Sequence, residues 1–346
     1  MSHDVNVAVV GYGFASQTFH VPLILATPGL QLTAVSSSDA AKVAAALPEV
    51  AVAATPQALF ARDDVDLVVI PTPNETHFTL AKAALAAGKH VVLDKPFTVT
   101  LAEAKQLKSL ADDAGRRLSV FHNRRWDSDF MTLKALLASG ELGRVVSLES
   151  RFDRFRPAVR DRWREKPRPG GGIWYDLGPH LLDQACELFG MPRAIQLNLA
   201  RQRDEASVED DFLCLLDYPS CRVSLAASAL VAAETPRFRV HGTQGSYVKY
   251  GLDPQEARLK AGETPAPAWG VDLRDGSLSL AEGSEGQVRE ASHATLPGDY
   301  LAYYRGVVAA LSGSGEMPVS VEDALRSMRL LEAGLDSHRQ GRWVSL

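Results

Sequence analysis

Short apolar runs alternate with helical patterns over the first third of the chain. The runs are rich in β-branched residues, which is typical of strands covered on both faces. They lie at residues 5–10, 30–35, 66–70, 90–93 and 118–121. Strands that alternate with helices predict βαβ units around a parallel sheet with right-handed crossovers. We therefore expect residues 1–121 to form a doubly wound α/β domain of the Rossmann type.

Helix boundaries are marked in two of the intervening segments. Thr100 and Glu103 have the spacing of a capping box, and Gly115 stands where a C-terminal cap belongs. A second apolar stripe begins at Phe78 and ends before Gly88. Both segments are predicted to be helices that cover the sheet.

The pattern changes after Phe121, where runs of strands follow one another with few helices between them. Helical patterns cover 129–139 and 177–189, and strand patterns cover 145–155, 194–202, 210–217, 221–230 and 236–242. Residues 251–298 are polar and rich in Gly and Pro, which predicts an irregular excursion with short strands; helical patterns at 299–312 and 321–339 close the chain. We expect residues 122–346 to be an α+β domain with a large, mainly antiparallel open sheet.

The composition excludes several classes of protein. A length of 346 residues predicts two domains, at about 150 residues each. Lys and Arg number 37 and Asp and Glu 42, and a net charge of −5 gives no cationic field for nucleic acid or anionic lipid.

No apolar run approaches the roughly 20 residues of a membrane span, and Met1–Asn6 lacks the core of a secretory signal. Cys186, Cys214 and Cys221 show no paired spacing, which excludes a disulfide scaffold or zinc site. We expect a cytoplasmic protein.

A glycine-rich loop follows the first apolar run and opens a helical pattern. It reads Gly11, Tyr12, Gly13, Phe14, Ala15 and Ser16. In a dinucleotide-binding loop the first glycine allows a tight turn, the second lets the backbone approach the pyrophosphate, and the helix N-terminus offers free N–H groups. Ser16 replaces the usual third glycine with another small residue. An ordinary strand-to-helix turn is the alternative, but the βαβ context favours a nucleotide site.

The end of the second strand bears on the choice of coenzyme. Ser36, Ser37 and Ser38 stand where an NAD-selective enzyme carries an acidic residue, about 20 residues past the glycines. Hydroxyls can donate to a 2′-phosphate that a carboxylate would repel, so Ser37 favours NADP over NAD. Lys42 is the one nearby cation; alternatively, the serines form a turn in which Asp39 caps the next helix.

Two further motifs carry chemistry. Lys95 follows the run at 90–93, at the sheet edge where ligands bind, and Pro96 restricts the backbone beside it. Asp176 and His180 are four residues apart in a helical pattern, so a carboxylate can orient an imidazole for acid–base work. The alternatives are a surface lysine, a helix cap at Asp176 and a buried structural histidine. A metal site that adds Asp183 fits the same helix face but leaves Lys95 unexplained, and we expect no metal.

These motifs resemble those of the Gfo/Idh/MocA oxidoreductases, two-domain dehydrogenases of sugars and cyclitols. The resemblance covers nearly the whole chain and rests on the glycine loop, Lys95–Pro96, Asp176 with His180, and the loop residues Thr72, Pro73, Asn74 and His77, all in the family's order. A narrower likeness, to the NADP-dependent scyllo-inositol dehydrogenase branch, rests on residues 11–13, 122–127, 162–166, 175–178 and 247–251. The family generally carries Glu where this chain has Asp94.

The resemblance implies a catalytic set of Lys95, Asp176 and His180, and coenzyme contacts from the glycine loop, Ser36–Ser38, the Thr72–His77 loop and Lys95. Asn123, Trp163 and Tyr175 are our candidates for substrate contact beside the catalytic set, or else for packing between the domains. We expect hydride exchange between NADP(H) and a cyclic polyol or sugar, with scyllo-inositol favoured and His180 or Lys95 taking the proton. A reductase of an anhydro-sugar ketone is the alternative, followed by an inert nucleotide sensor and a flavin or methyl-donor protein. The resemblance also implies a homodimer or homotetramer formed through the open face of the second sheet.

Overall fold

The computed structural model describes residues 4–266, 268–283 and 286–346. The chain forms two compact units. Unit 1 comprises residues 1–123, 255–269 and 299–328, and unit 2 comprises residues 124–254, 270–298 and 329–346. Two segments from the second half of the chain therefore pack with the N-terminal residues.

Unit 1 is built around sheet A, whose six strands all run parallel in the order β3-β2-β1-β4-β5-β6. The strands are β1 Val5–Val10, β2 Leu30–Ser36, β3 Ala51–Ala53, β4 Leu67–Ile70, β5 His90–Leu93 and β6 Leu118–Val120. Val9 of β1 lies between Val35 on β2 and Val69 on β4, and all three side chains are fully buried. Burial on both faces explains why these strands read as continuous apolar runs.

Most helices of unit 1 connect the strands of sheet A, as βαβ crossovers require. They are η1 Ser16–His20, α1 Val21–Leu25, α2 Ala40–Ala46, α3 Pro56–Phe60, η2 Asn74–Thr76, α4 His77–Ala86 and α5 Leu101–Asp113. Helices α8 Gln255–Lys260 and α9 Leu301–Leu311 belong to the two segments that return from the second half of the chain. Both bonds of the capping box between Thr100 and Glu103 are present, so this prediction is confirmed. Tyr303 of α9 donates to Ser119 of β6 at 3.0 Å, and Ser119 donates to the Val319 carbonyl at 2.8 Å. These bonds hold the returning segment beneath the sheet.

Unit 2 is built around sheet B, a nine-stranded sheet in the order β14-β13-β12-β11-β7-β10-β9-β8-β15. Its strands are β7 Val145–Arg151, β8 Ala194–Ala200, β9 Asp211–Asp217, β10 Arg222–Ser228, β11 Phe238–Gly242, β12 Gly245–Lys249, β13 Gly276–Glu282, β14 Gln287–His293 and β15 Val344–Ser345. Neighbouring strands are antiparallel except β7 and β10. The expected fold class is confirmed in both units.

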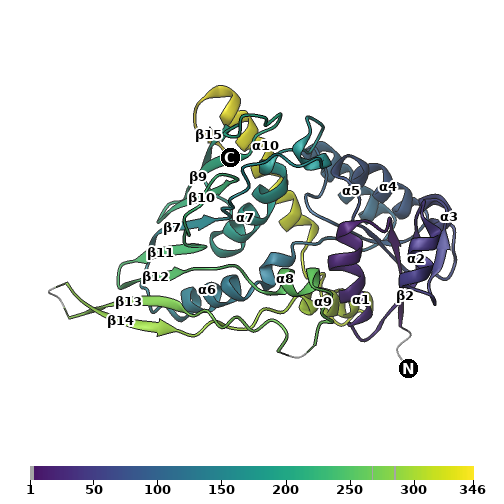
Figure 1. Cartoon of the computed structure of the whole chain (residues 1–346), viewed down its shortest axis with the longest axis horizontal. Coiled ribbons are helices and arrows are strands. Elements are labelled where there is room, and N and C mark those ends of the chain that lie inside the picture. The colour runs from purple at the N-terminus through teal and green to yellow at the C-terminus, as the bar shows by residue number, and fades with distance from the viewer. Residues whose placement is uncertain (1–3, 267, 284–285) are drawn as a thin grey trace. The chain divides into compact units, whose positions relative to one another are not determined.

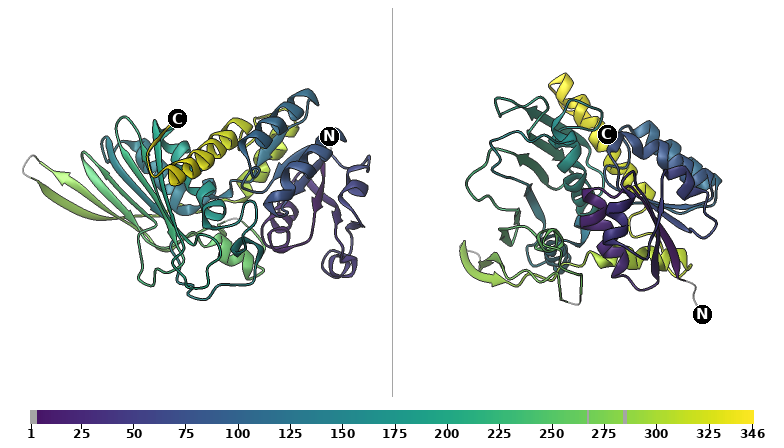
Figure 2. Two further views of the ribbon diagram at one scale, coloured as in Figure 1. Left: turned by 90° about the horizontal axis from the view of Figure 1, so that it is seen from above. Right: turned by 45° about the vertical axis from the view of Figure 1, so that its right-hand side comes forward.

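Helices α6 Ser128–Ser139 and α7 Ile173–Phe189 lie against one face of sheet B, as Figures 1 and 2 show. Trp174 of α7 is fully buried, packs edge-on against Phe212 of β9, and donates its indole N–H to the Leu331 carbonyl at 3.1 Å. Leu331 belongs to α10 Val321–Gln340, which also contributes to the core. The short helices η3 Asn123–Trp126 and η4 Trp163–Glu165 complete the described helices.

The structure differs from the sequence expectation in several regions. The strand β3 was not expected, because its three residues are too few to show a period. In the expected excursion at 251–298, α8 and a regular hairpin of β13 and β14 occur, while residues 267 and 284–285 lie outside the described residues. Helix α7 begins at Ile173 rather than at residue 177, so that its first turn contains Asp176.

Among the described residues, no helix is both long enough and apolar enough to span a bilayer.

Candidate active site

Four loops of unit 1 meet at the carboxyl edge of sheet A. Gly11 follows β1, Ser36 ends β2, Thr72 follows β4, and Lys95 follows β5. The strand order reverses between β1 and β4, and ligands of open parallel sheets bind in the crevice at such a switch point. The topology therefore brings the glycine loop and Lys95 to one edge, although 84 positions separate residues 11 and 95.

The glycine loop has the geometry that a diphosphate requires. Gly11 has φ +82°, a left-handed conformation that favours glycine, and its N–H donates to the Ser36 carbonyl at 2.8 Å. A Cβ added at Gly13 would meet no atom within 4 Å, so the backbone there is open to a ligand. Helical residues begin at Phe14. These residues fit a bound dinucleotide, which would lie with its pyrophosphate against the loop.

Ser16 closes the turn at the position where the loop lacks its third glycine. Its side chain is 1% exposed and its hydroxyl donates to the Gly11 carbonyl at 2.7 Å. Gln17 donates from its side-chain amide to the Tyr12 carbonyl at 2.8 Å. The loop is thus fixed by side chains of the helix that follows it.

The serines after β2 are partly committed to local structure. Ser36 is buried and its hydroxyl lies 3.3 Å from the Gly11 amide. The Ser37 hydroxyl accepts from the Asp39 amide at 3.0 Å, while Asp39 caps α2 by accepting from the Lys42 amide at 3.0 Å. Ser38 is exposed. The Lys42 ammonium lies 5.9 Å from the centre of the Tyr12 ring, which brings a cation to the glycine loop.

His77 joins the loop after β4 to the loop after β5. It is fully buried, with Nδ1 2.9 Å from the Pro96 carbonyl oxygen and Nε2 2.9 Å from the Thr72 carbonyl oxygen. Burial lowers the pKa of His77, against the opposing influence of Asp94. Asn74 is also buried, and the Thr72 and Thr76 hydroxyls lie 2.6 Å apart. His77 therefore contributes to the site by holding two of its loops together.

Lys95 stands in a turn with a cis Lys95–Pro96 peptide bond. Asp94 accepts from the Lys95 amide at 2.8 Å, and its second carboxylate oxygen lies 4.0 Å from Nε2 of the buried His20. Burial raises the pKa of Asp94, but the charges and contacts of His20, Lys95 and His77 outweigh it and hold the pKa well below its usual value. His20 Nδ1 is held 2.7 Å from the Tyr304 hydroxyl. Asp94, whose side chain is shorter than the Glu of the resemblance, thus has His20 beside its carboxylate.

In unit 2, the acid–base candidates lie one turn apart on α7. His180 is 5% exposed, whereas Asp176 is partly exposed in the first turn and its carboxylate lies 3.1 Å from Arg164 Nε. Gly172 precedes the helix with φ +89°, and a Cβ added there would lie 2.0 Å from a carboxylate oxygen of Glu209. A glycine is required for Glu209 to approach the start of the helix.

The remaining polar groups on this face of α7 form ion pairs. Asp183 is 2% exposed and binds Arg125 through two hydrogen bonds of 2.8 and 2.7 Å, while Arg125 also reaches Glu187 at 3.2 Å. Arg124 pairs with Asp127 at 3.2 Å. Asp183 therefore holds a cation in place, and no group of three metal-ligating side chains occurs among the described residues.

The three substrate-contact candidates come from different segments. Asn123 is buried at the end of the first segment of unit 1. Trp163 and Tyr175 are half-buried in unit 2, and the Arg164 guanidinium lies 4.5 Å from the centre of the Trp163 ring. Their contact with a substrate stays a prediction.

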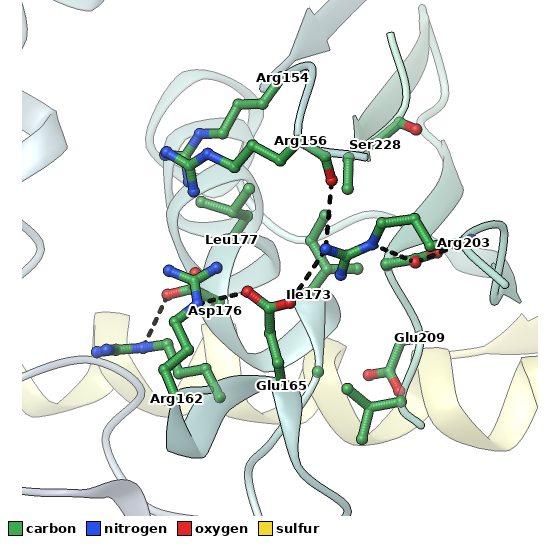
Figure 3. Close-up of a pocket in the computed structure, with 15 residues that line it drawn as sticks. Arg154, Arg156, Arg162, Glu165, Ile173, Asp176, Leu177, Arg203, Glu209 and Ser228 are labelled. Carbon is green, nitrogen blue, oxygen red and sulfur yellow. Dashed lines mark hydrogen bonds and ion pairs between the residues drawn. The ribbon is translucent and has the colours of Figure 1, made fainter. Parts of the chain in front are cut away.

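A pocket beside Asp176 was not expected from the sequence. Five arginines contribute to its lining, namely Arg154, Arg156, Arg162, Arg164 and Arg203 (Figure 3). Its space outside the protein atoms is about 470 Å³ when the side open to solvent is included. The signal that could have found it is Arg154-x-Arg156 at the end of the strand predicted at 145–155, since alternate residues of an extended segment share one face.

Comparison with known proteins relates both units to one family. Residues 5–122 match the family model described as the NAD-binding Rossmann fold of the GFO_IDH_MocA oxidoreductases, and residues 134–346 match their C-terminal alpha/beta domain. The chain is 58% identical over 338 residues to the uncharacterized oxidoreductase YdgJ of Escherichia coli, covering 97% of each chain. It is 36% identical over 348 residues to the NADP-dependent scyllo-inositol 2-dehydrogenase IolW of Bacillus subtilis, covering 99% of this chain and 96% of the relative.

A solved structure agrees with these matches. YPO2259 from Yersinia pestis superposes with a TM-score of 0.95 at 54% identity, covering 100% of this chain and 98% of that one. Family models matching most of the chain, together with relatives that align along nearly its full length, leave one assignment. This chain belongs to the Gfo/Idh/MocA family of oxidoreductases.

Proposed function

We propose that this oxidoreductase interconverts a hydroxyl and a ketone on a cyclic polyol or sugar, using NADP(H), and that scyllo-inositol is among the neutral substrates it turns over. The observation that carries the proposal is Lys95 at the carboxyl edge of a nucleotide-binding sheet. Full-length similarity to an NADP-dependent scyllo-inositol 2-dehydrogenase supports the choice of substrate.

When bound, the nicotinamide coenzyme supplies the redox chemistry, as acceptor or donor of hydride. Gly11 and Gly13 would hold its diphosphate, and the loops after β2 and β4 would line its remaining length. The Ser38 hydroxyl and the Lys42 ammonium suit a 2′-phosphate, because they supply a donor and a positive charge where an NAD-selective enzyme carries a carboxylate. Ser37, whose hydroxyl donates to the Asp39 carbonyl at 3.2 Å, leaves this position without a negative charge.

The proton is handled by side chains of this chain. In the direction of alcohol oxidation, His180 accepts the hydroxyl proton at a ring nitrogen, and in the reverse direction it returns that proton to the carbonyl oxygen. Lys95 donates a hydrogen bond to the same oxygen and stabilises the negative charge that develops there. Asp176, one turn before His180 on α7, orients the imidazole and favours its charged form after transfer.

The test is a pair of substitutions assayed by absorbance at 340 nm with scyllo-inositol and NADP⁺. Lys95→Ala and His180→Ala should each lower kcat by roughly a hundredfold or more, the range for loss of one acid–base group. NADPH should still bind both variants, as measured by fluorescence titration, because neither substitution alters the glycine loop.

Lys105→Ala is the control, since Lys105 is exposed on α5 and is not among the candidate site residues. Unchanged turnover in either test variant would contradict the assignment. Turnover of an anhydro-sugar ketone but not of any inositol would favour the alternative reductase, with the same catalytic groups.

A further inference from the structure

The pocket beside Asp176 is formed by side chains that two extended segments bring together. Past the end of β7, Arg154 N–H donates to the Ser228 carbonyl at 2.9 Å and Arg156 N–H donates to the Ala229 carbonyl at 2.7 Å. Phe155 between them forms a bridge with Leu230 and is 59% exposed. Because successive residues of an extended segment point to opposite sides, both arginines project to the pocket side.

Three arginines of the pocket form ion pairs with acidic side chains that also line it. Arg203 is 9% exposed and binds Glu165 at 3.0 Å and Asp210 at 2.7 Å. Glu165 also binds Arg162 at 2.6 Å. The third is Arg164, which pairs with Asp176 and so offsets the negative charge that this carboxylate brings to the pocket.

Arg156 differs from these three. Within the described part of the chain it makes no ion pair, and the strongest charge acting on it is that of Arg154. Figure 3 shows the two guanidinium groups reaching the same place. Burial first, and then Arg154, Arg160 and Arg162, lower the pKa of Arg156 to about 10, which leaves it charged at neutral pH. Arg203 also fixes this segment by donating to the Arg156 carbonyl at 3.3 Å.

Five arginines line the pocket against four acidic residues, Glu165, Asp176, Glu209 and Asp210, so the lining as a whole carries an excess of positive charge. Such a lining is suited to a phosphate or a carboxylate, which arginine binds through paired N–H donors. We infer that Arg154 and Arg156 bind an anionic group of the substrate, so that sugars or polyols bearing a phosphate or carboxylate are preferred over neutral ones. This inference rests on the proposed function, because it assigns the pocket to the substrate that His180 acts on.

The spacing along α7 agrees with this assignment. Asp176 lines the pocket, and His180 lies four residues further along the same helix, which is about 6 Å at 1.5 Å per residue. A six-carbon sugar can span that length with a reacting carbon at one end and an anionic group at the other. The phosphate or carboxylate would thus orient the substrate from the end that does not react.

Equilibrium binding to the full chain tests the subsite independently of turnover. Isothermal titration calorimetry is performed with D-glucose, D-glucose 6-phosphate and D-glucuronate, at low and at high salt. We expect at least one of the anionic ligands to bind tenfold or more tightly than D-glucose, and to lose most of that preference at high salt because salt screens exposed charges. The two anionic ligands distinguish a phosphate from a carboxylate.

Arg154→Gln and Arg156→Gln should each reduce the preference for the anionic ligand tenfold or more, and Arg156→Lys should restore only part of it because the paired donors are lost. Arg201→Gln is the matched control, since Arg201 is exposed and does not line the pocket. Both Gln variants should keep the NADPH affinity of the wild type.

The outcomes separate the two proposals. If neutral polyols are turned over but no anionic ligand binds more tightly, or if the preference survives both Gln substitutions, the anion subsite is wrong and the proposed function stands. If the arginine-dependent preference is found but no polyol or sugar, neutral or anionic, supports NADP(H) turnover, the proposed function is wrong. A loss of NADPH affinity in the Gln variants would assign the arginines to the coenzyme and overturn the inference.

Discussion

At the scale of single residues, short polar side chains determine how the nucleotide loop is held. Ser16 stands where such loops usually have a third glycine, and the helix still lies close to the loop, because the Ser16 hydroxyl donates a hydrogen bond to the Gly11 carbonyl. His20 lies 4.0 Å from Asp94, the shorter residue in the position where the family generally has Glu. Ser16 and Asp94, which depart from the motifs of the resemblance, thus each make a local contact.

Under the proposed preference for NADP, Ser37 is the residue on which we expect coenzyme choice to depend most directly. Ser37→Asp places a carboxylate where the 2′-phosphate is expected, so electrostatic repulsion should lower the NADP⁺/NAD⁺ ratio of kcat/KM by tenfold or more. Steady-state kinetics with both coenzymes measures the ratio. Ser37→Ala is the control for loss of the turn that the hydroxyl makes with Asp39. An unaltered NADP⁺/NAD⁺ ratio of kcat/KM in the Asp variant would show that Ser37 does not determine the choice of coenzyme.

Asp94 should make the stability of the protein depend on pH. Its folded pKa is held below the unfolded value, so the stabilisation is complete above the unfolded pKa of about 3.9 and is lost as the pH falls through the lower folded pKa. Asp94→Asn should therefore lower the free energy of unfolding at neutral pH by about 1–3 kcal/mol, and by less below about pH 4.

Urea denaturation at both pH values measures this difference. Asp63→Asn is the control, because Asp63 is exposed and makes no ion pair within the described residues. A deficit in the Asn variant that is the same at acidic and neutral pH would show that lost packing, and not the carboxylate's charge, is responsible.

At the scale of elements, α7 connects the core of unit 2 to the two proposed acid–base residues. Trp174 anchors one side of the helix in the core, while Asp176 and His180 come from its first two turns. Gly172 precedes the first turn of the helix, and a Cβ added there would collide with the Glu209 carboxylate.

Gly172→Ala tests the effect of this collision. The added Cβ should displace Glu209 or the first turn, lower stability by about 1–3 kcal/mol, and lower kcat by tenfold or more because Asp176 moves with the turn. Gly190→Ala is matched to it, since Gly190 ends the same helix with φ +72° but has no atom within 4 Å of an added Cβ. The control should lose some stability and keep kcat. Equal kcat in both variants would contradict the link from Gly172 to Asp176.

At the scale of the whole molecule, one face of sheet B has no helix over it in the described part of the chain (Figure 2). In β9, Phe212, Cys214 and Leu216 are buried toward α7, so the alternate residue Leu213 points to the other face, where it is 44% exposed. We propose that copies of the chain associate through this face, as family membership suggests.

Leu213→Lys should shift the oligomer toward smaller species, because it places a charge within the proposed interface. Light scattering coupled to size-exclusion chromatography measures the mass. Leu273→Lys is the control, since Leu273 is 91% exposed and lies outside the sheet strands. A mass unaffected by the substitution at Leu213, or reduced equally by both, would be evidence against this interface.

The sequence by itself determined the strands of sheet A, the capping box of α5 and the order of the chemical motifs. Doubly buried strands, glycine turns and helix caps are local properties, and each leaves its own period or residue type in the chain. Only the tertiary structure decided that Asp183 belongs to an ion pair with Arg125, that residues 255–269 and 299–328 pack in unit 1, and that Arg154 and Arg156 share a pocket with Arg203. Those contacts join residues far apart in sequence, and they depend on which strands pair and in what register, which no local pattern records.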